Sequence, residues 1–416
     1  MLCLTYNRSG GNKVQKKKLS RAAVNIEYAA VQGVYWLLSC ITFTFAAVFL
    51  QGKGYTNSQL GTILFCGNLV GFFVTPLLGA ASDKSVFLTE LRVLWIVTAV
   101  FGVSLALILI PGEKSLALTV GWALLVVVLC AYYPFITQLS FRMGRWGNHV
   151  SFGVGRGVGS LVFALGSAAL GNLVAALGID VLPITGVVML LLFSALFGLI
   201  SVQDRGRSAK SDQRKLEAAR ESVSLLEFFR ENKRFSLCML GIALLYFAHS
   251  VVGNFEINVV RNVGGDSRDM GRITAFMGLC ELPAMFLFDR LLRRFRCSAL
   301  MKFAIVMFPL KALAMALAGS IPMLYAAHAL QAVSFALITP ATVRYAGLAV
   351  SRRDTGKAQT VAASAITLGA TFASLAAGHM FDRIGVFATL MAAFAVSCAG
   401  AVLAFAMTDK QYNTEH

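Results

Sequence analysis

The sequence VFATLMAAFAVSCAGAVLAFAMT, at residues 386–408, contains no charged side chain. A helix needs about 20 consecutive apolar residues to cross the hydrocarbon core of a bilayer, so this stretch is long enough for one crossing. The rest of the chain is similar, because 57% of its 416 residues are hydrophobic and only 14% are charged. Water-soluble domains contain about 25% charged residues. The composition therefore indicates an integral membrane protein with little sequence left for a soluble domain.

A hydropathy window of about 19 residues separates twelve apolar segments of this kind. Six come before a polar stretch at residues 203–234, and six come after it. The expected spans are residues 31–50, 59–81, 91–110, 116–141, 150–177, 182–202, 235–260, 271–288, 299–318, 323–350, 358–380 and 386–408. We therefore predict an all-α, multi-pass membrane protein with twelve transmembrane helices.

Lysine and arginine gather in every second connection between these segments, most densely in the N-terminal tail and the central linker. Positively charged loops stay on the cytoplasmic side, so this bias predicts that both termini are cytoplasmic. We expect the membrane to be a bacterial plasma (inner) membrane. The expected parts are a basic N-terminal tail (1–30), a six-helix half (31–202), a cytoplasmic linker (203–234), a second six-helix half (235–408) and a cytoplasmic tail (409–416).

The net charge of +17 does not indicate a nucleic-acid partner, because the basic residues lie in short loops rather than on one soluble face. The eight cysteines are scattered through apolar runs without metal-ligand spacing, and we interpret them as buried free thiols. No phosphate-binding loop or nucleophile with an adjacent base stands out. We therefore predict no metal, no cofactor and no enzymatic activity.

A few features of the sequence occur twice, at an offset of 206 or 207 residues. The recurring pairs are Asp83-Lys84 with Asp289-Arg290, Pro134 with Pro340, and Gly171-x6-Gly178 with Gly378-x6-Gly385. Such a repeat predicts two pseudo-symmetric six-helix halves, the parallel-repeat arrangement of secondary transporters, whose site lies between the halves near mid-membrane. The alternative is that proline and glycine recur by chance in helices of similar composition.

The repeated loops resemble the loop motif of a known family. Gly79-x-x-x-Asp83-Lys84 resembles the start of the loop motif of the major facilitator superfamily, which implies the major facilitator fold. A second copy, without the leading glycine, is formed by Asp289, Arg290, Arg293 and Arg294. An acidic group at a helix end beside basic groups can pair with helix termini and hold one arrangement of the halves. An ordinary cytoplasmic loop with paired charges is the alternative.

Within that superfamily the chain most resembles the lactose permease branch of oligosaccharide:proton symporters. Phe152-Gly153-x-x-Arg156-x-x-Gly159 resembles the segment with the sugar-binding arginine, and Glu281 resembles the coupling glutamate. The resemblance also covers residues 327–335. Three residues depart from the branch: Gln331 stands in place of its histidine, Ser334 in place of its glutamate, and Gln138 in place of its sugar-binding glutamate.

Ionisable residues inside the expected spans form a short list. Each costs roughly 2.5 to 3.5 kcal/mol at the centre of a helix, so it should face the bundle interior, water or an opposite charge. Arg156 is the best candidate substrate ligand, since a guanidinium offers five donors; snorkelling to the interface is the alternative. Glu281 and Lys311 lie at similar depth and are predicted to pair, either as a proton site or as a fixed ion pair. The list is Arg156, His249, Glu256, Glu281, Lys311 and His328.

Other polar and aromatic residues complete the expected site. His249 and Glu256 share one face of span seven, so His249 is a candidate substrate ligand, while Glu256 and His328 are candidates for proton coupling. A hydrogen-bonded structural histidine and an interfacial glutamate are the alternatives. Gln138 and Gln331 are neutral candidate ligands. Aromatic residues that could stack on a solute are Tyr35, Trp36, Tyr132, Tyr133, Tyr246 and Tyr325.

Among these aromatic residues, Tyr132 and Tyr133 are preferred, because Pro134 follows them and can bend span four at the cavity. Packing and interfacial anchoring are the alternative roles.

These observations predict a secondary transporter that moves a small polar, sugar-like solute by alternating access, coupled to protons through Glu281. Its partners would be the solute, protons and the lipid bilayer, and we expect a monomer. One alternative is a facilitator or exporter of aromatic acids, nucleosides or drug-like compounds, with Arg156 as a carboxylate clamp. A second alternative is a non-transporting membrane receptor or scaffold with the same fold.

Overall fold

The computed structural model describes residues 20–85, 87–110, 112–146, 150–204, 225–351 and 354–408. These residues form helices joined by short connections, with no strand among them. In this part of the chain, nine helices are long and apolar enough to cross a membrane, or up to ten if one bent pair counts as a span. The predicted all-α membrane fold is confirmed, while the number of twelve spans stays a prediction.

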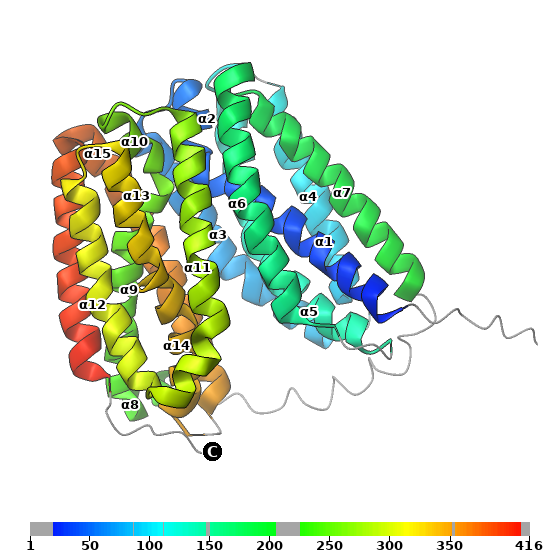
Figure 1. The fold of residues 1–416 in the computed structure, drawn as a ribbon. Helices are drawn as coiled ribbons and strands as arrows, with labels where there is room; N and C mark the ends of the chain where they lie inside the picture. The colour runs from blue at the N-terminus through cyan, green and yellow to red at the C-terminus, as the bar shows by residue number, and fades with distance from the viewer. Residues whose placement is uncertain are drawn as a thin grey trace, which may run out of the picture.

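The helices before residue 205 form one bundle, most of it at the right of Figure 1. Its elements are α1 (Arg21–Ser39), the π-helix η1 (Cys40–Thr44), α2 (Ala46–Gly52), α3 (Asn57–Lys84), α4 (Glu90–Leu109), α5 (Leu116–Gly144), α6 (Phe152–Leu177) and α7 (Val181–Asp204). In this bundle α1 packs on α6, and α5 packs on α3 and α4. α1 begins at Arg21, earlier than the expected span, because the Ser20 side chain caps it by accepting a hydrogen bond from the N–H of Ala23.

The helices after residue 224 form a second bundle, at the left of Figure 1. Its elements are α8 (Leu225–Glu231), α9 (Lys233–Asn254), α10 (Glu256–Asn262), α11 (Ser267–Arg294), α12 (Cys297–Leu317), α13 (Ile321–Ala329), the 3-10 turn η3 (Leu330–Ala332), α14 (Phe335–Leu348) and α15 (Thr355–Met407). α15 combines two expected spans, which meet at a non-helical residue, Gly385. The C-terminal part of the expected linker is helical, since α8 begins at Leu225; residues 205–224 lie outside the described chain.

Glycine conformations support the predicted repeat. In the described chain every residue with positive φ is a glycine, and the four form two pairs at equivalent connections, Gly54 with Gly264 and Gly178 with Gly385. Gly178 has φ 88° and ψ 177°, and Gly385 has φ 75° and ψ −178°. This region of backbone space is essentially restricted to glycine. The recurrence of Gly178 and Gly385 in the sequence therefore reflects one shared backbone shape in the two bundles.

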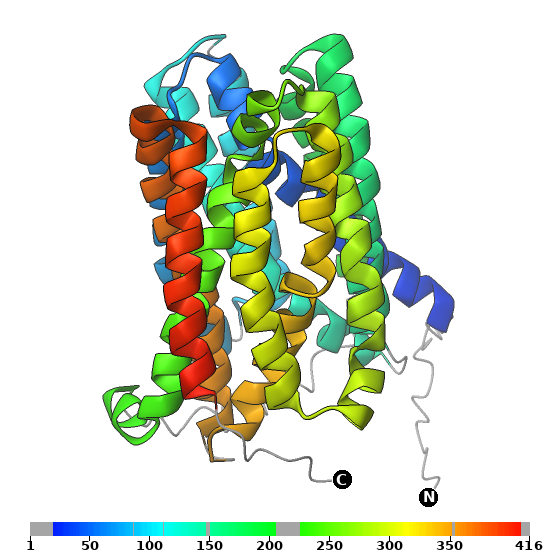
Figure 2. The same ribbon diagram turned by 60° about the vertical axis from the view of Figure 1, so that its left-hand side comes forward.

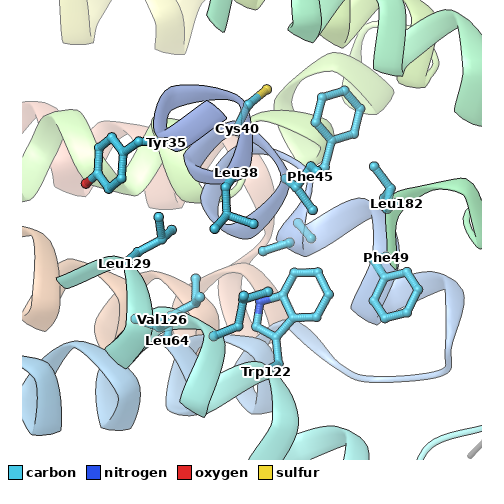
Figure 3. Close-up of a cluster of buried hydrophobic side chains, with 14 of the residues drawn as sticks. Tyr35, Leu38, Cys40, Phe45, Phe49, Leu64, Trp122, Val126, Leu129 and Leu182 are labelled. Atoms are coloured by element: carbon cyan, nitrogen blue, oxygen red, sulfur yellow. The ribbon is translucent and has the colours of Figure 1, made fainter. Parts of the chain in front are cut away.

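The first long helix of each bundle is interrupted at a buried phenylalanine. The chain bends by 49° between η1 and α2, where Phe45 has φ −92° and ψ 4°. Phe255 separates α9 from α10 with φ −125° and ψ 25°. Figure 3 shows the core around the first of these bends, with Phe45 and Leu38 above Trp122 of α5. The ring of Trp122 also stacks on Phe49, with ring centroids 5.0 Å apart. Dense packing thus holds the interrupted helix in place.

The two bundles meet mainly where α3 packs on α15 and where α6 packs on α11. Glycines allow backbone to touch backbone at both crossings. A Cβ atom added to Gly61 would overlap the carbonyl oxygen of Ser374, and one added to Gly171 would lie 2.6 Å from the carbonyl oxygen of Ser267. Gly378 and Gly271 approach the facing helices in the same way. Small residues of this kind let membrane helices pack closely.

One of these crossings also carries a polar contact between the bundles. The carboxylate of Asp382 accepts hydrogen bonds from the backbone N–H groups of Asn57 (3.2 Å) and Ser58 (2.7 Å) at the start of α3. It also accepts from the Asn57 amide (2.8 Å) and the Ser58 hydroxyl (2.6 Å). A carboxylate from one bundle therefore caps a helix N-terminus of the other, where the helix dipole favours negative charge.

Side-chain amides extend this contact. Gln51 of α2 donates to Asn57 (2.7 Å) and to Asn258 of α10 (2.8 Å), while Arg261 donates to Gln51 (2.6 Å). α2 and α10 both lie at the top of Figure 1, far from the start of α1 and the end of α15. Polar contacts between the bundles therefore gather at this end, which we call the closed end.

Gly385→Ala and Gly178→Ala should each lower the free energy of unfolding by about 1 to 3 kcal/mol, because alanine is strained at these backbone angles. An added Cβ would meet no atom within 4 Å at either position, so the loss would come from backbone strain alone. Gly198→Ala, in α7 and equally unobstructed, is the control and should be neutral or slightly stabilising. Thermal unfolding in detergent measures all three; an unchanged midpoint for Gly385→Ala would contradict the argument.

Asp382→Asn should loosen the closed end, because an amide offers one acceptor oxygen where four donors converge on a carboxylate. Spin labels at Thr62 and Arg383 should then report more molecules with long distances than in the wild type. Asp180→Asn is the matched control, since Asp180 pairs with Lys53 of its own bundle. Equal distance distributions in the wild type and Asp382→Asn would refute the expectation.

The same contact has a defined pH dependence. Asp382 lies in the connection between the expected spans 358–380 and 386–408, outside the membrane-spanning segments. Burial raises the pKa of Asp382, but the hydrogen bonds from Ser58 and Asn57 outweigh burial and hold this pKa below its usual value. The contact should therefore keep its full strength above the usual carboxyl range and weaken only as the pH falls through the lowered pKa.

Candidate functional site

Arg156 of α6 lies against an aromatic ring of α1. Its guanidinium carbon is 3.8 Å from the ring centroid of Trp36, and its guanidinium also donates a hydrogen bond to Ser160 one turn on. Gly159 makes this arrangement possible, because a Cβ at this position would overlap the indole of Trp36. The planar group is thereby held by a cation–π contact, with donors left for a further partner.

Further aromatic rings surround this arginine. Trp36 packs against Tyr35 (5.4 Å between centroids), Tyr133 (6.4 Å) and Phe163 (6.4 Å). Tyr133 is nevertheless 43% exposed, so one side of this cluster is not covered by protein. The first bundle therefore presents an aromatic surface around one cation.

Across from it, the second bundle presents a carboxylate. Arg156 interacts electrostatically with Glu281 of α11, although the two groups are too far apart for a direct ion pair. Glu281 is only partly exposed and accepts a hydrogen bond of 2.8 Å from the Gln331 amide. Gln331 in turn accepts a hydrogen bond from the ammonium of Lys311. Arg156, Glu281, Gln331 and Lys311 therefore form one polar line across the boundary between the bundles.

The predicted direct pair of Glu281 and Lys311 needs correction. In the described residues these side chains do not touch, and the Gln331 amide lies between them as acceptor and donor. Gln331 reaches this position because the helix of span ten is broken at η3, and Ser334 has φ −102° and ψ −90°. Figure 2 shows this break in the amber part of the ribbon, between α13 and α14. Interrupted helices at mid-membrane are typical of transporter binding sites.

His249 lies beside this line. Its imidazole stacks on Phe335 (4.7 Å between centroids) and packs edge-on against Tyr246 (6.3 Å). Together with Lys311 it lines a cavity of about 20 Å³ between α9 and α12. A space of this size holds one water molecule. His249 is thus placed near the expected site, next to Lys311 rather than next to Arg156.

Glu256 and His328 form a second, deeply buried polar pair. His328 Nε2 and Glu256 Oε1 are 2.9 Å apart, and the two residues are 1% and 4% exposed. The pair joins α13 to α10 near the closed end. The sequence placed both residues among the coupling candidates but did not predict that they pair with each other.

Two of the expected substrate ligands, Tyr132 and Gln138, are not part of the polar line. Tyr132 is fully buried inside the first bundle, stacked on Phe193 (4.7 Å), with its hydroxyl 2.8 Å from that of Thr98. It supports the bundle and does not reach the polar line, so of the two adjacent tyrosines Tyr133 is the candidate ligand. Gln138 is partly exposed on α5, more than one turn beyond Tyr133.

The residues of the loop motif lie at the ends of α3 and α11, away from this site. Lys84, Asp289, Arg290, Arg293 and Arg294 are exposed, and Gly79 has open space where a Cβ would be. The side chain of Asp83 lies outside the described part of the chain. Their role in holding the two halves together therefore stays a prediction.

Some polar contacts were not anticipated from the sequence. Arg142 of α5 donates to Glu90 (2.6 Å) and to Asp204 (2.7 Å), which joins α4, α5 and α7 in a buried cluster. Asp382 of the closed end was likewise missed. These residues lie at or just beyond the ends of hydrophobic segments, where charges are common, so no local signal distinguishes them.

Two helical bundles, close glycine crossings and a polar line between them define a membrane transporter of the major facilitator fold. Residues 28–392 match the model of the MFS_1 like family, and the chain belongs to that family. No curated protein matches the sequence.

Solved structures share the fold at low sequence identity. The nucleoside transporter NupG has 16% identity and a TM-score of 0.73, with 92% of this chain and 98% of that chain covered. A point mutant of NupG has 14% identity and a TM-score of 0.77, with 93% and 100% covered. A bacterial homolog of the human lysosomal transporter Spinster, in an inward-facing and unoccupied conformation, has 14% identity and a TM-score of 0.67, with 94% and 98% covered.

Gly159→Ala should lower the free energy of unfolding by about 1 to 3 kcal/mol, because its methyl group would force Trp36 out of position. Gly157→Ala, half a turn away, is the matched control, since its Cβ would meet only Phe286 at 3.8 Å. In a Trp36→Ala background the cost of Gly159→Ala should largely disappear. Thermal unfolding of the four variants measures this coupling; additive effects would show that Trp36 and Gly159 do not depend on each other.

Proposed function

We propose that this protein is a secondary active transporter that moves a small polar, sugar-like solute and couples this movement to protons. The observation that carries the proposal is the polar line from Arg156 through Glu281 and Gln331 to Lys311, which crosses the boundary between the bundles. Ionisable groups in a membrane interior are functional candidates because they are costly to bury. In a carrier with two halves, such groups meet at the substrate site.

The residues of this line have complementary chemistry. The guanidinium of Arg156 can donate to several hydroxyl oxygens of a solute, and Trp36 and Tyr133 can pack on the face of a ring. Glu281 can accept further donors from the solute when it is ionised and can carry a proton when it is not. Binding and protonation at one carboxylate would couple the two movements. This division of roles also fits the resemblance to the lactose permease branch.

Alternating access would use the closed end. The contacts of Asp382 and the glycine crossings join the bundles there, so separation at this end would open the site to the opposite side. On the predicted topology the closed end is extracellular and both termini are cytoplasmic, in a bacterial plasma membrane. The proposal requires one chain only, since both halves of the site lie in the same molecule.

A second candidate solute class is nucleosides or aromatic acids. Aromatic rings on both bundles favour it, with Trp36 and Tyr133 on one side and Phe335 on the other, and NupG is described as a nucleoside transporter. Arg156 would then bind a carboxylate or a base edge. Competition of sugars, nucleosides and aromatic carboxylates for uptake into proteoliposomes distinguishes the classes, because only the true class competes.

Glu281→Gln should abolish proton-driven accumulation while exchange of solute across the membrane continues, because an amide keeps the hydrogen bond but carries no titratable proton. For one proton per solute, a gradient of about one pH unit drives up to about tenfold accumulation, and the variant should fall to about equal concentrations. Glu113→Gln, at an exposed loop position, is the control. Gradient-driven accumulation at the wild-type level in Glu281→Gln would contradict coupling through this residue.

A further inference from the structure

The buried pair of His328 and Glu256 shares no hydrogen bond with the polar line at Arg156 in the described residues, although Lys311 of that line interacts electrostatically with Glu256. His328 Nε2 contacts Glu256 Oε1 at 2.9 Å, whereas His328 Nδ1 is buried without a hydrogen-bond partner in the described chain. An imidazole bonded through one nitrogen only can add a proton at the other. The cation so formed would face a carboxylate at contact distance.

The charges in the interior of the second bundle do not balance on their own. Glu256 and Glu281 contribute two negative charges when ionised, and Lys311, which interacts electrostatically with both carboxylates, contributes one positive charge. His249 and His328 are uncharged unless protonated. With both carboxylates ionised and both histidines neutral, the bundle interior would carry one uncompensated negative charge, which is costly in a medium of low dielectric. One added proton neutralises it.

The helices around α13 carry several titratable groups. Asp269 and Arg272 of α11 interact with Tyr325 of α13. The groups in the interior of the bundle are His249 on α9, Glu256 on α10, Glu281 on α11 and Lys311 on α12. The two carboxylates have different partners. Glu281 interacts electrostatically with Arg156 of the other bundle, while Glu256 contacts His328.

Of the two carboxylates, Arg156 compensates the charge of Glu281 only. When the solute occupies the guanidinium of Arg156, Glu281 loses part of its counter-charge, and the second bundle must find a cation elsewhere. His328 is a group that can become one without moving, since it already contacts Glu256.

We propose that His328, held by Glu256, is a second proton-binding residue of this transporter, protonated when Glu281 is ionised. The inference rests on the proposed function. In the loading step a hydronium ion gives its proton to His328 Nδ1: an N–H bond forms, an O–H bond breaks and water remains. Nε2 keeps its hydrogen bond to Glu256 throughout. The small cavity lined by His249 and Lys311 offers a place for a water molecule beside the polar line.

The variant His328→Lys distinguishes a proton site from a fixed ion pair. His328→Lys keeps a cation against Glu256, so a purely structural pair would remain functional. Lysine stays protonated beside a carboxylate, so a proton site would be lost. His328→Gln removes the charge altogether and is the second variant, which covers the case in which lysine does not fit.

In proteoliposomes, both variants should exchange solute at rates within about threefold of the wild type. Under a gradient of about one pH unit, their accumulation should fall from about tenfold to about equal concentrations. His379→Lys, at an exposed position of α15, is the control and should accumulate as the wild type does. Wild-type accumulation by His328→Lys would overturn the proposal.

A titration without solute tests the proposal independently of transport. With a pH-indicator dye, the purified wild type should take up about one more proton per chain than His328→Lys when the solution is acidified. His379→Lys, which removes a histidine outside this pair, is the control variant. Equal uptake by wild type and His328→Lys would overturn the inference even if transport is confirmed. Absence of any solute flux in the wild type would instead overturn the proposed function.

Discussion

An ionised side chain among lipid tails costs roughly 2.5 to 3.5 kcal/mol, and this cost is removed only by water, a counter-charge or converging hydrogen bonds. In the interior of this protein, charged side chains have polar or aromatic partners. Lys311 and Glu281 share the amide of Gln331, Arg156 lies on the indole of Trp36, and Glu256 contacts His328. Polar groups from distant parts of the chain are therefore drawn together at the boundary between the bundles.

Close approach of backbone is the second condition for this arrangement. The bundles touch through glycines, Gly61 against α15 and Gly171 against α11, and such contacts leave no room for side chains. They bring the helix ends near enough for Asp382 to cap α3 of the other bundle. The contact is strong in one arrangement only, because its four hydrogen bonds are lost together when the bundles separate. A carrier needs interfaces of this kind, which are stable when closed but are formed by few contacting residues.

Much of the candidate site was predictable because an ionisable residue type is costly in an apolar segment. Arg156, Glu281, Lys311, Gln331 and the pair of His328 and Glu256 stand out in apolar segments, and the structure places them along one boundary or next to it. The choice between Tyr132 and Tyr133 was not predictable, since adjacent residues on a helix point about 100° apart and both lie among apolar neighbours. The break at η3 was equally hidden, because residues 330–334 read as ordinary helix.

The sequence by itself determined that the chain is helical, lies in a membrane and repeats a backbone pattern, since hydropathy, charge asymmetry and the recurring glycines are local properties. Tertiary structure alone decided which polar groups meet: that Gln331 separates Glu281 from Lys311, that His328 selects Glu256, and that Asp382 binds Asn57 and Ser58. The reason is that a hydrogen bond depends on distances of a few tenths of an ångström, and the crossing of helices far apart in the chain sets those distances.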